Sequence, residues 1–125
     1  MDRKKKILLV DDSSTVLLME RMILSKSEFD VITAKDGVEG LEKARAERPD
    51  LILMDVVMPR MDGFEACRQL RGASDTSRIP IIMVTTRGEL ASVDAGYQSG
   101  CNDYVTKPID GTELLTKVRS CLGQS

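Results

Sequence analysis

The sequence predicts an α/β fold built on a doubly wound, five-stranded parallel sheet with the strand order 2-1-3-4-5. Five short apolar runs alternate with segments of helical spacing along the whole chain. Most of these runs are continuous rather than alternating, which is typical of parallel strands buried on both faces. Polar side chains suited to chemistry follow four of the five runs, and this places the second strand at the edge of the sheet.

The apolar runs are each too short for a helix, so we expect five strands. They span Ile7–Val10, Val31–Ala34, Leu51–Met54, Ile79–Val84 and Asn102–Val105. Between them, apolar residues recur three or four positions apart, which predicts helices in a β-α order repeated five times. These helical positions are Val16, Met19 and Ile23; Val38, Leu41 and Ala44; Phe64, Cys67 and Leu70; and Leu115, Val118 and Leu122.

Most of the predicted helices begin with the same pattern, a capping residue followed three positions later by glutamate. In such a capping box the first side chain accepts a backbone N–H, and the glutamate reaches back to the cap. The pattern occurs at Asp36–Glu39, Asp62–Glu65, Thr86–Glu89 and Asp110–Glu113. The segment Asp11–Ser14 lacks it and instead places two acids together after the first strand, which invites a functional explanation.

Composition indicates one globular domain, over residues 1–125. The chain is 42% hydrophobic and 30% charged, which is ordinary for a soluble protein. The net charge of −2 argues against nucleic acid as a direct ligand, and we interpret the basic run Arg3–Lys6 as a solvated arm. No apolar stretch is long enough for a membrane span or a signal peptide, so we expect a cytoplasmic protein without membrane insertion.

Two residue types limit the possible chemistry. The chain has no histidine, which excludes Ser-His-Asp and Cys-His catalysis, HExxH zinc sites and a phosphotransfer histidine. Its three cysteines, Cys67, Cys101 and Cys121, show no metal-binding or CxxC spacing, and we expect reduced thiols. Much of enzyme chemistry is thereby excluded.

The candidate site consists of polar residues at the carboxyl ends of the strands, where open parallel sheets bind their ligands. Asp11 and Asp12 follow the first strand, and Asp55 follows the third. Thr85 follows the fourth strand, and Lys107 follows the fifth. Three converging carboxylates repel one another unless a cation lies among them. Because the available ligands are oxygens, we expect Mg²⁺, for which Mn²⁺ can substitute.

Asp55 is the candidate nucleophile, because it directly follows a hydrophobic strand and precedes Val56-Val57-Met58-Pro59 at the mouth of the site. Its carboxylate can attack a phosphoryl donor to form an aspartyl phosphate. Mg²⁺ and Lys107 would neutralise the charge, and Thr85 would donate a hydrogen bond to a phosphoryl oxygen. Taken singly, each of these signals is weak, since adjacent acids more often cap a helix. Their combination at four strand ends points to this chemistry.

The segments LLVDD, LILMDVVMPRMDG, IIMVTT and DYVTKP stand in the order and spacing found in receiver domains of bacterial two-component response regulators. Over nearly all of its length the chain resembles the single-domain chemotaxis (CheY-like) type. The resemblance implies a flavodoxin-like fold and phosphorylation by a sensor histidine kinase or phosphotransfer protein, with an unidentified downstream target. It also implies a monomer or a weak phosphorylation-dependent dimer that is not a turnover enzyme.

For the cation site, the resemblance implies that Asp11 and Asp12 hold Mg²⁺, the second directly and the first partly through water. Asp55 and the backbone carbonyl of Val57 would complete the protein ligands. Lys107 would pair with the carboxylate or the phosphate of Asp55, and a cis peptide would follow Lys107.

For the switch, the resemblance implies that phosphorylation draws Thr85 inward and lets Tyr104 turn toward the core. Partner proteins would recognise the altered surface formed by the fourth helix, the fifth strand and the fifth helix. Two positions that vary in the family are Val57 and Arg87, which flank the path of water to the phosphate. Val57 cannot orient a water and Arg87 can stabilise the phosphate, so we expect slow self-dephosphorylation.

Three alternatives share parts of this pattern. A pseudo-receiver would keep the fold as a phosphorylation-independent binding module, although such proteins usually lose one of the five site residues. A Mg²⁺-dependent phosphohydrolase of the haloacid dehalogenase type would carry a second aspartate where Val57 stands. A flavodoxin-like flavin carrier would suffer repulsion between Asp11, Asp12 and the flavin phosphate, and the chain has few aromatic residues to stack on the ring.

Overall fold

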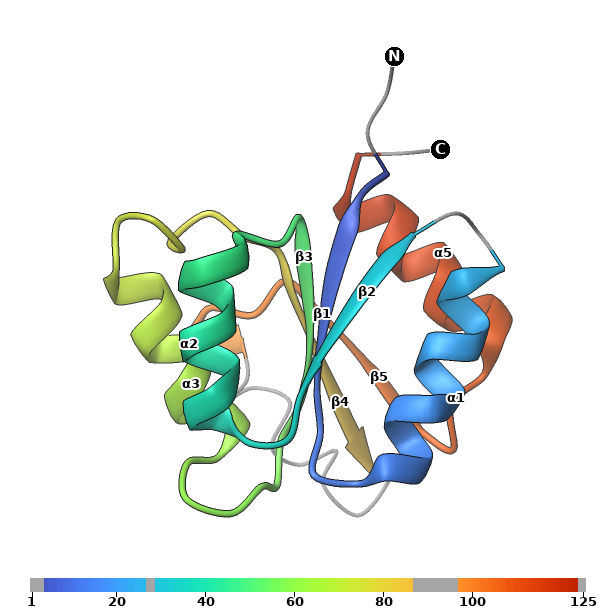
Figure 1. The fold of residues 1–125 in the computed structure, drawn as a ribbon, viewed down its shortest axis with the longest axis horizontal. Coiled ribbons are helices and arrows are strands. Elements are labelled where there is room, and N and C mark those ends of the chain that lie inside the picture. Colours follow the sequence, from blue (N-terminus) through green and yellow to red (C-terminus); the bar gives the residue numbers. More distant parts are fainter. Residues whose placement is uncertain (1–3, 27–28, 87–96, 124–125) are drawn as a thin grey trace.

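The computed structural model describes residues 4–26, 29–86 and 97–123. Its centre is a sheet of five parallel strands in the order β2-β1-β3-β4-β5. The strands are β1 Lys6–Val10, β2 Asp30–Ala34, β3 Leu51–Asp55, β4 Ile81–Thr86 and β5 Asp103–Lys107. The predicted fold class and strand order are therefore confirmed, with β2 at one edge of the sheet (Figure 1).

Helices cover both faces of this sheet. α2 and α3 lie on one side, and α1 and α5 lie on the other (Figure 1). Their bounds are α1 Ser14–Ser25, α2 Gly37–Glu47, α3 Gly63–Gly72 and α5 Gly111–Cys121. The cap predicted for the fourth helix at Glu89 lies outside the described residues, and residues 97–99 of that region are helical. Within the described chain, no helix has both the length and the apolar character needed to cross a membrane.

The bounds of all five strands differ from the prediction by one or two residues, and β4 and β5 differ at both ends. β4 begins at Ile81 instead of Ile79, because Pro80 has no N–H to give to a ladder and the N–H of Ile79 donates to the carbonyl of Thr76 at 3.2 Å. β5 runs from Asp103 to Lys107 instead of from Asn102 to Val105. The Asn102 side chain accepts the N–H of Ile81, the first residue of β4, at 2.8 Å. Asn102 therefore lies just before β5 and is not part of it.

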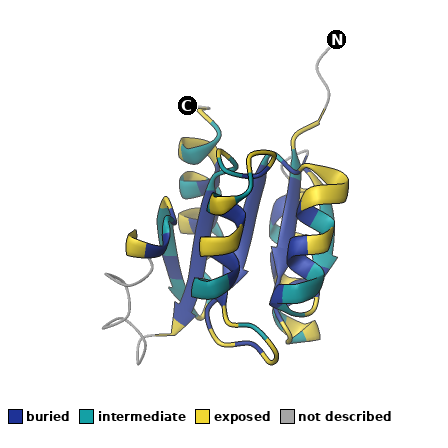
Figure 2. Ribbon diagram, turned by 90° about the vertical axis from the view of Figure 1, so that its left-hand side faces the viewer, coloured by how far each residue is buried: buried dark blue, intermediate teal, exposed yellow. Residues whose placement is uncertain are grey.

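The core consists of two layers, because alternate residues of each buried strand face opposite helix pairs. One layer contains Leu8, Val10, Ile52, Met54, Ile81 and Met83 with residues of α2 and α3. The other contains Ile7, Leu9, Leu51, Leu53, Ile82 and Val84 with residues of α1 and α5. Figure 2 shows the buried strands between the helices, whose outer faces are exposed. Of the three cysteines, which are free thiols, Cys67 and Cys101 are buried.

Three aspartates cap the helices as predicted. The carboxylates of Asp36, Asp62 and Asp110 accept the N–H of the residue three positions later at 2.9, 2.9 and 3.0 Å. Within the described residues, Glu39, Glu65 and Glu113 do not complete the reciprocal capping box. Glu39 accepts the N–H of Lys35 at 2.7 Å, one residue before the cap, and Glu65 is held by Arg68 and Gln69. The caps were predictable, whereas the glutamate partners depended on nearby side chains.

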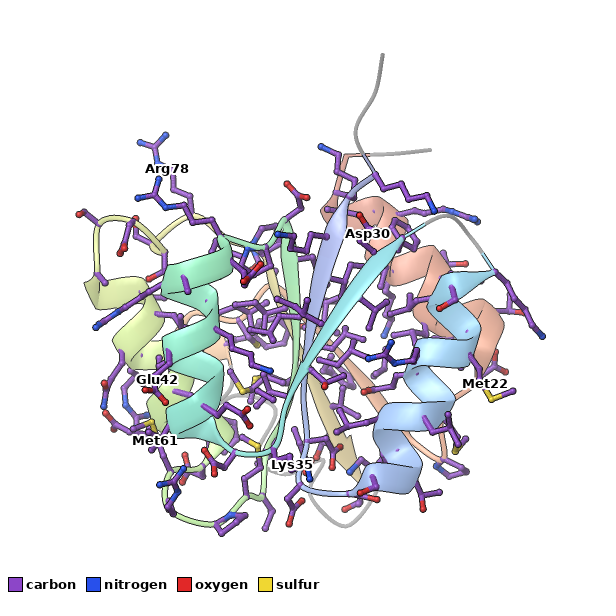
Figure 3. The ribbon with its side chains drawn as sticks, in the orientation of Figure 1. Met22, Asp30, Lys35, Glu42, Met61 and Arg78 are labelled. Atoms are coloured by element: carbon purple, nitrogen blue, oxygen red, sulfur yellow. The ribbon has the colours of Figure 1, made fainter. Side chains whose placement is uncertain are left out.

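The inner face of α1 differs from the one that its apolar spacing suggested. Met19 is exposed, and Val16 and Ile23 are only half-buried. The buried row of this helix is Leu17, Glu20 and Leu24. Met22, on the outer face, points away from the sheet (Figure 3). An acid therefore occupies a position that faces the core.

Candidate functional site

Three carboxylates meet at the carboxyl end of the sheet. Val10 and Met54 are partners in the β1–β3 ladder, so the residues that follow them, Asp11 and Asp55, emerge side by side. One oxygen each of Asp11, Asp12 and Asp55 lies within 4.8 Å of the others. Asp11 and Asp55 are buried, at 1% and 5% exposure, whereas Asp12 is exposed. Figure 1 shows this end of the sheet at the bottom, where α1 begins.

Backbone contacts hold Asp11 in place. Its N–H donates to the carbonyl of Ala34 on β2 at 3.1 Å, and its Oδ1 accepts the N–H of Ser13 at 2.9 Å. Ser13 is in turn the cap of α1 and accepts the N–H of Val16 at 3.3 Å. The acids after β1 therefore do not cap the helix themselves. They remain available for another ligand.

Lys107 at the end of β5 joins the two buried acids. Its Nζ lies 3.2 Å from Oδ2 of Asp11 and 3.2 Å from Oδ1 of Asp55. The contact with Asp55 is a hydrogen bond. Oδ2 of Asp11 is buried and has no well-directed hydrogen bond within the described chain, so its contact with Lys107 is an ion pair only.

The charges at this site are strongly coupled. Burial, together with the neighbouring charge of Asp11, raises the pKa of Asp55 to about 6, although Lys107 opposes the shift. Burial disfavours the charge of Lys107, but Asp55 and Asp11 outweigh that effect and raise its pKa. One ammonium group therefore compensates the acids only in part, which leaves an excess of negative charge at the site.

Comparison with known proteins decides what this arrangement is. The family model for the response regulator receiver domain matches residues 7–119. The chain belongs to the response regulator receiver family. It is 42% identical over 117 residues to PilH of Pseudomonas aeruginosa, covering 94% of this chain and 97% of that protein.

Other relatives of this receiver domain include one longer protein and one solved receiver structure. It is 42% identical over 121 residues to the alkaline phosphatase synthesis transcriptional regulatory protein PhoP of Bacillus subtilis. That match covers 97% of this chain but 50% of PhoP, so the chain spans about half of this relative's length. The receiver domain of the sensor histidine kinase PA1611 from Pseudomonas aeruginosa is 30% identical, with a TM-score of 0.90 over 98% of this chain and all of that one. That structure has a magnesium ion coordinated in the active site cleft.

The side chains of this receiver domain fit a hard divalent cation. The donor set is three carboxylates, which is the chemistry that Mg²⁺ and Ca²⁺ prefer over softer metals. One buried oxygen of the set, Oδ2 of Asp11, lacks a hydrogen-bond donor in the described chain. The site therefore has unsatisfied acceptor capacity where a cation would bind.

Thr85, Val57 and the peptide bond after Lys107 belong to the described part of the receiver. Thr85 is buried at the end of β4, one residue beyond the ladder partner of Asp55, and its hydroxyl donates to the carbonyl of Thr86 at 3.4 Å. Val57 is 64% exposed beside the site. The cis peptide expected after Lys107 is present. Arg87 lies outside the described residues.

Tyr104 lies on β5, half-buried, and is held by two neighbours. Its ring packs edge-to-face with that of Tyr97 at 6.3 Å between centroids. The Nζ of Lys117 lies 4.8 Å from the Tyr104 ring centre and donates to the Tyr104 carbonyl at 2.6 Å. The ring therefore has partners both in the segment before β5 and on α5.

Two residues near the site were not predicted. Gly63, at the start of α3, lies so close to β3 that an added Cβ would be 2.2 Å from the carbonyl oxygen of Asp55. Glu20 on α1 is 1% exposed, and its charge is coupled to those of Asp11, Asp55 and Lys107. The interpretation of Asp62-Gly63 as a helix cap explains why Gly63 was missed. Glu20 was detectable only from its place midway between Leu17 and Leu24.

Proposed function

We propose that this receiver domain is a phosphorylation-dependent signalling switch in which Asp55 accepts a phosphoryl group from a sensor histidine kinase or phosphotransfer protein. One observation carries the proposal: at the carboxyl end of the parallel sheet, the ammonium group of Lys107 lies 3.2 Å from each of two buried carboxylates, those of Asp55 and Asp11. Such a carboxylate is a nucleophile whose product can be stabilised where it forms.

The transfer is a substitution at phosphorus. A carboxylate oxygen of Asp55 forms the new P–O bond as the P–N bond of the donor phosphohistidine breaks, and the bonding electron pair leaves with the imidazole nitrogen, which takes a proton. Lys107 is 3.2 Å from the attacking carboxylate and neutralises charge on the phosphoryl group. Thr85 would donate its hydroxyl to a phosphoryl oxygen.

Asp11, Asp12, Asp55 and the backbone carbonyl of Val57 would hold Mg²⁺, and Mn²⁺ would substitute for it. Bound there, the cation supplies positive charge against the phosphoryl oxygens. The unsatisfied acceptor capacity at Oδ2 of Asp11 and the magnesium ion in the PA1611 receiver support this assignment. The chain modifies only itself in this scheme, so it is not a turnover enzyme.

Phosphorylation would change the surface that includes β5 and α5, through Thr85 and Tyr104. A phosphoryl group adds about −1.5 to −2 charges. Tyr104 is held from outside by Tyr97 and Lys117, and an inward turn of its ring would break both contacts. The downstream partner would recognise this difference, with the receiver acting in the cytoplasm as a monomer or a weak phosphorylation-dependent dimer.

Incubation with Mg²⁺ and acetyl phosphate, followed by intact-mass measurement, tests the proposal. We expect one phosphoryl adduct on the wild type and none on Asp55→Asn or in the presence of EDTA. Asp75→Asn, an exposed acid in the turn after α3, is the matched control and should form the adduct. Absence of the adduct from the wild type would favour the pseudo-receiver, a binding module that works without phosphorylation.

A further inference from the structure

Lys117 on α5 reaches around the open edge of the sheet. β5 is an edge strand, and α5 lies on the same side of the sheet as α1 (Figure 1). Val105 belongs to the core layer on that side, whereas Tyr104 packs against the layer of α2 and α3. The ammonium group of Lys117 nevertheless lies 4.8 Å from the centre of the Tyr104 ring. A cation from one face of the sheet therefore contacts an aromatic ring that belongs to the other face.

Contacts with the backbone and with two acids hold this ammonium group in place. Its Nζ donates to the Tyr104 carbonyl at 2.6 Å and lies 3.7 Å from Asp103 and 4.0 Å from Glu113. The Asp103 carboxylate in turn accepts the N–H of Tyr104 at 2.8 Å. None of these contacts involves the ring of Tyr104. The ammonium group is therefore anchored independently of the direction in which the ring is turned.

We propose that Lys117 is a positioning residue of the switch, which holds the Tyr104 ring in its outward position and so opposes the change of state. A group shifts a two-state equilibrium only through contacts that differ between the states. The cation–π contact is of this kind, because an inward turn of the ring breaks it while the anchor of Lys117 remains. The inference rests on the proposed function, in which phosphorylation of Asp55 turns Tyr104 inward.

The opposite edge of the sheet provides a comparison. Lys43 on α2 pairs with Glu39, four residues earlier, at 3.5 Å and donates to the carbonyl of Thr33 in β2, the other edge strand. Lys117 repeats this arrangement with Glu113 and with a carbonyl of β5. Among the described residues, only Lys117 adds a cation–π contact to it. The ring contact is therefore what distinguishes Lys117 from a lysine that only covers a strand edge.

The size of the effect follows from the contact. A cation–π contact near the surface favours the state that contains it about two- to fivefold. A ligand that binds the inward state should therefore bind more tightly by about this factor when the contact is lost. Beryllofluoride with Mg²⁺ is such a ligand, because it forms a stable mimic of an acyl phosphate on a carboxylate.

NMR of protein with ¹³C-labelled tyrosine rings measures this affinity. The chain has two tyrosines, so a Tyr97→Phe background in every sample leaves the Tyr104 signal alone and keeps an aromatic ring at position 97. The Tyr104 signal is followed as beryllofluoride is added at constant Mg²⁺. We expect Lys117→Gln to lower the half-saturating beryllofluoride concentration about two- to fivefold. Loss of a positive charge alone would weaken binding of this anion, so the expected change has the opposite sign to a simple electrostatic effect.

Two further variants separate the ring contact from the edge contacts. Lys117→Arg keeps a cation beside the Tyr104 ring and should stay within about twofold of the parent protein. Lys43→Gln removes the equivalent edge lysine and its ion pair from β2, and it should leave the half-saturating concentration unchanged. Side chains at both positions are partly exposed, so the variants should fold.

The possible failures are distinguishable. An unchanged or higher half-saturating concentration in Lys117→Gln would overturn the role of Lys117, as would an equal decrease in Lys117→Arg or Lys43→Gln. A Tyr104 signal that beryllofluoride does not move, in a protein that acetyl phosphate modifies at Asp55, would overturn this inference and leave Asp55 as the acceptor. Absence of the phosphoryl adduct would overturn the proposed function, and the inference with it.

Discussion

The Nζ atom of Lys107 lies 3.2 Å from Oδ1 of Asp55, although the two residues are separated by 52 positions in the chain. β4 lies between their strands, so the contact reaches across one strand of the sheet. Lys107 also pairs with Asp11, and both acids are buried. This single ammonium group keeps the two acids together when no cation is bound.

Lys107→Met should therefore destabilise the cation-free protein. Removal of the ammonium group leaves two buried carboxylates without compensation, at a cost of about 1–3 kcal/mol in the free energy of unfolding. Urea denaturation in EDTA measures the loss, and added Mg²⁺ should restore part of it. Lys35→Met, which changes an exposed lysine after β2, should shift stability by less than about 0.5 kcal/mol. Equal effects of the two substitutions would contradict this account.

Gly63→Ala should disturb the backbone of the phosphoacceptor. The added Cβ would be 2.2 Å from the carbonyl oxygen of Asp55 and 2.8 Å from Cε of Met83, so β3 or α3 must shift. We expect a loss of about 1–3 kcal/mol in thermal or urea unfolding, with weaker phosphorylation by acetyl phosphate.

The control for that substitution lies at the other end of the same helix. A Cβ added at Gly72 would meet no atom within 4 Å, and Gly72→Ala should stabilise α3 by about 0.5–1 kcal/mol. Loss of stability in both variants, or in neither, would show that the approach of Gly63 to Asp55 is not what matters.

Replacement of Arg60 by glycine should lower the free energy of unfolding less than replacement by alanine. Its φ of 68° is left-handed, a conformation that costs a residue with a Cβ about 1 kcal/mol. Its guanidinium group pairs with Asp36 at 2.7 Å, and both Arg60→Gly and Arg60→Ala remove that exposed ion pair. Arg60→Gly should therefore exceed Arg60→Ala in stability by about 1 kcal/mol in urea denaturation. The reverse order would indicate that backbone strain at Arg60 is negligible.

Glu20 should make the fold less stable as the pH rises. In the unfolded chain its pKa is near 4.5, whereas burial raises it to about 8 in the folded chain. Between these values the folded chain holds one more proton, so the free energy of unfolding falls with increasing pH, by on the order of a few kcal/mol. Asp55 acts in the same direction, but only up to about pH 6.

Urea denaturation in EDTA from about pH 6 to about pH 8.5 isolates the effect of Glu20. The wild type should lose stability across this range, and Glu20→Leu should lose much less because its side chain carries no proton to exchange. Leucine should also pack with Leu17 and Leu24, so the variant should be at least as stable as the wild type near pH 8. Parallel pH profiles would contradict this prediction.

Val57→Asn should shorten the lifetime of the phosphorylated state. The Val57 side chain is 64% exposed beside Asp55 and cannot hydrogen-bond a water, whereas asparagine can orient one toward the phosphorus. We expect dephosphorylation to accelerate on the order of tenfold. The rate is measured from the loss of the phosphoryl adduct by intact-mass analysis after acetyl phosphate has been removed. A phosphorylated wild type with a shorter half-life than the variant would count against slow self-dephosphorylation.

The sheet and the strand-end residues were predictable because both depend on strong, local signals. Continuous apolar runs indicated buried parallel strands, and parallel strands bring their carboxyl ends to one edge, so Asp11, Asp55 and Lys107 had to converge. The start of β4 was less predictable, because Ile79 extends the apolar run although Pro80 interrupts the ladder.

The burial of Glu20 left only a weak signal in the sequence, its place between Leu17 and Leu24. Charged side chains are expected on the solvent-exposed face of a helix. In α1 the apolar residue Met19 stands directly before Glu20, so the sequence predicts that Met19 faces the core instead of Glu20. Only the packing of α1 on the sheet decides which of the two faces inward. The close approach of Gly63 to Asp55 likewise depends on how α3 sits against β3.

The strand order also affects how the chain acquires its site during folding. Asp11 and Asp55 come from adjacent strands, but Lys107 arrives only when β5 has docked beyond β4. A chain with only β1, β2 and β3 assembled would hold its acids without the ammonium group that compensates them. The complete cluster is therefore a marker of finished folding, because the ammonium group joins the acids only after the last strand has docked.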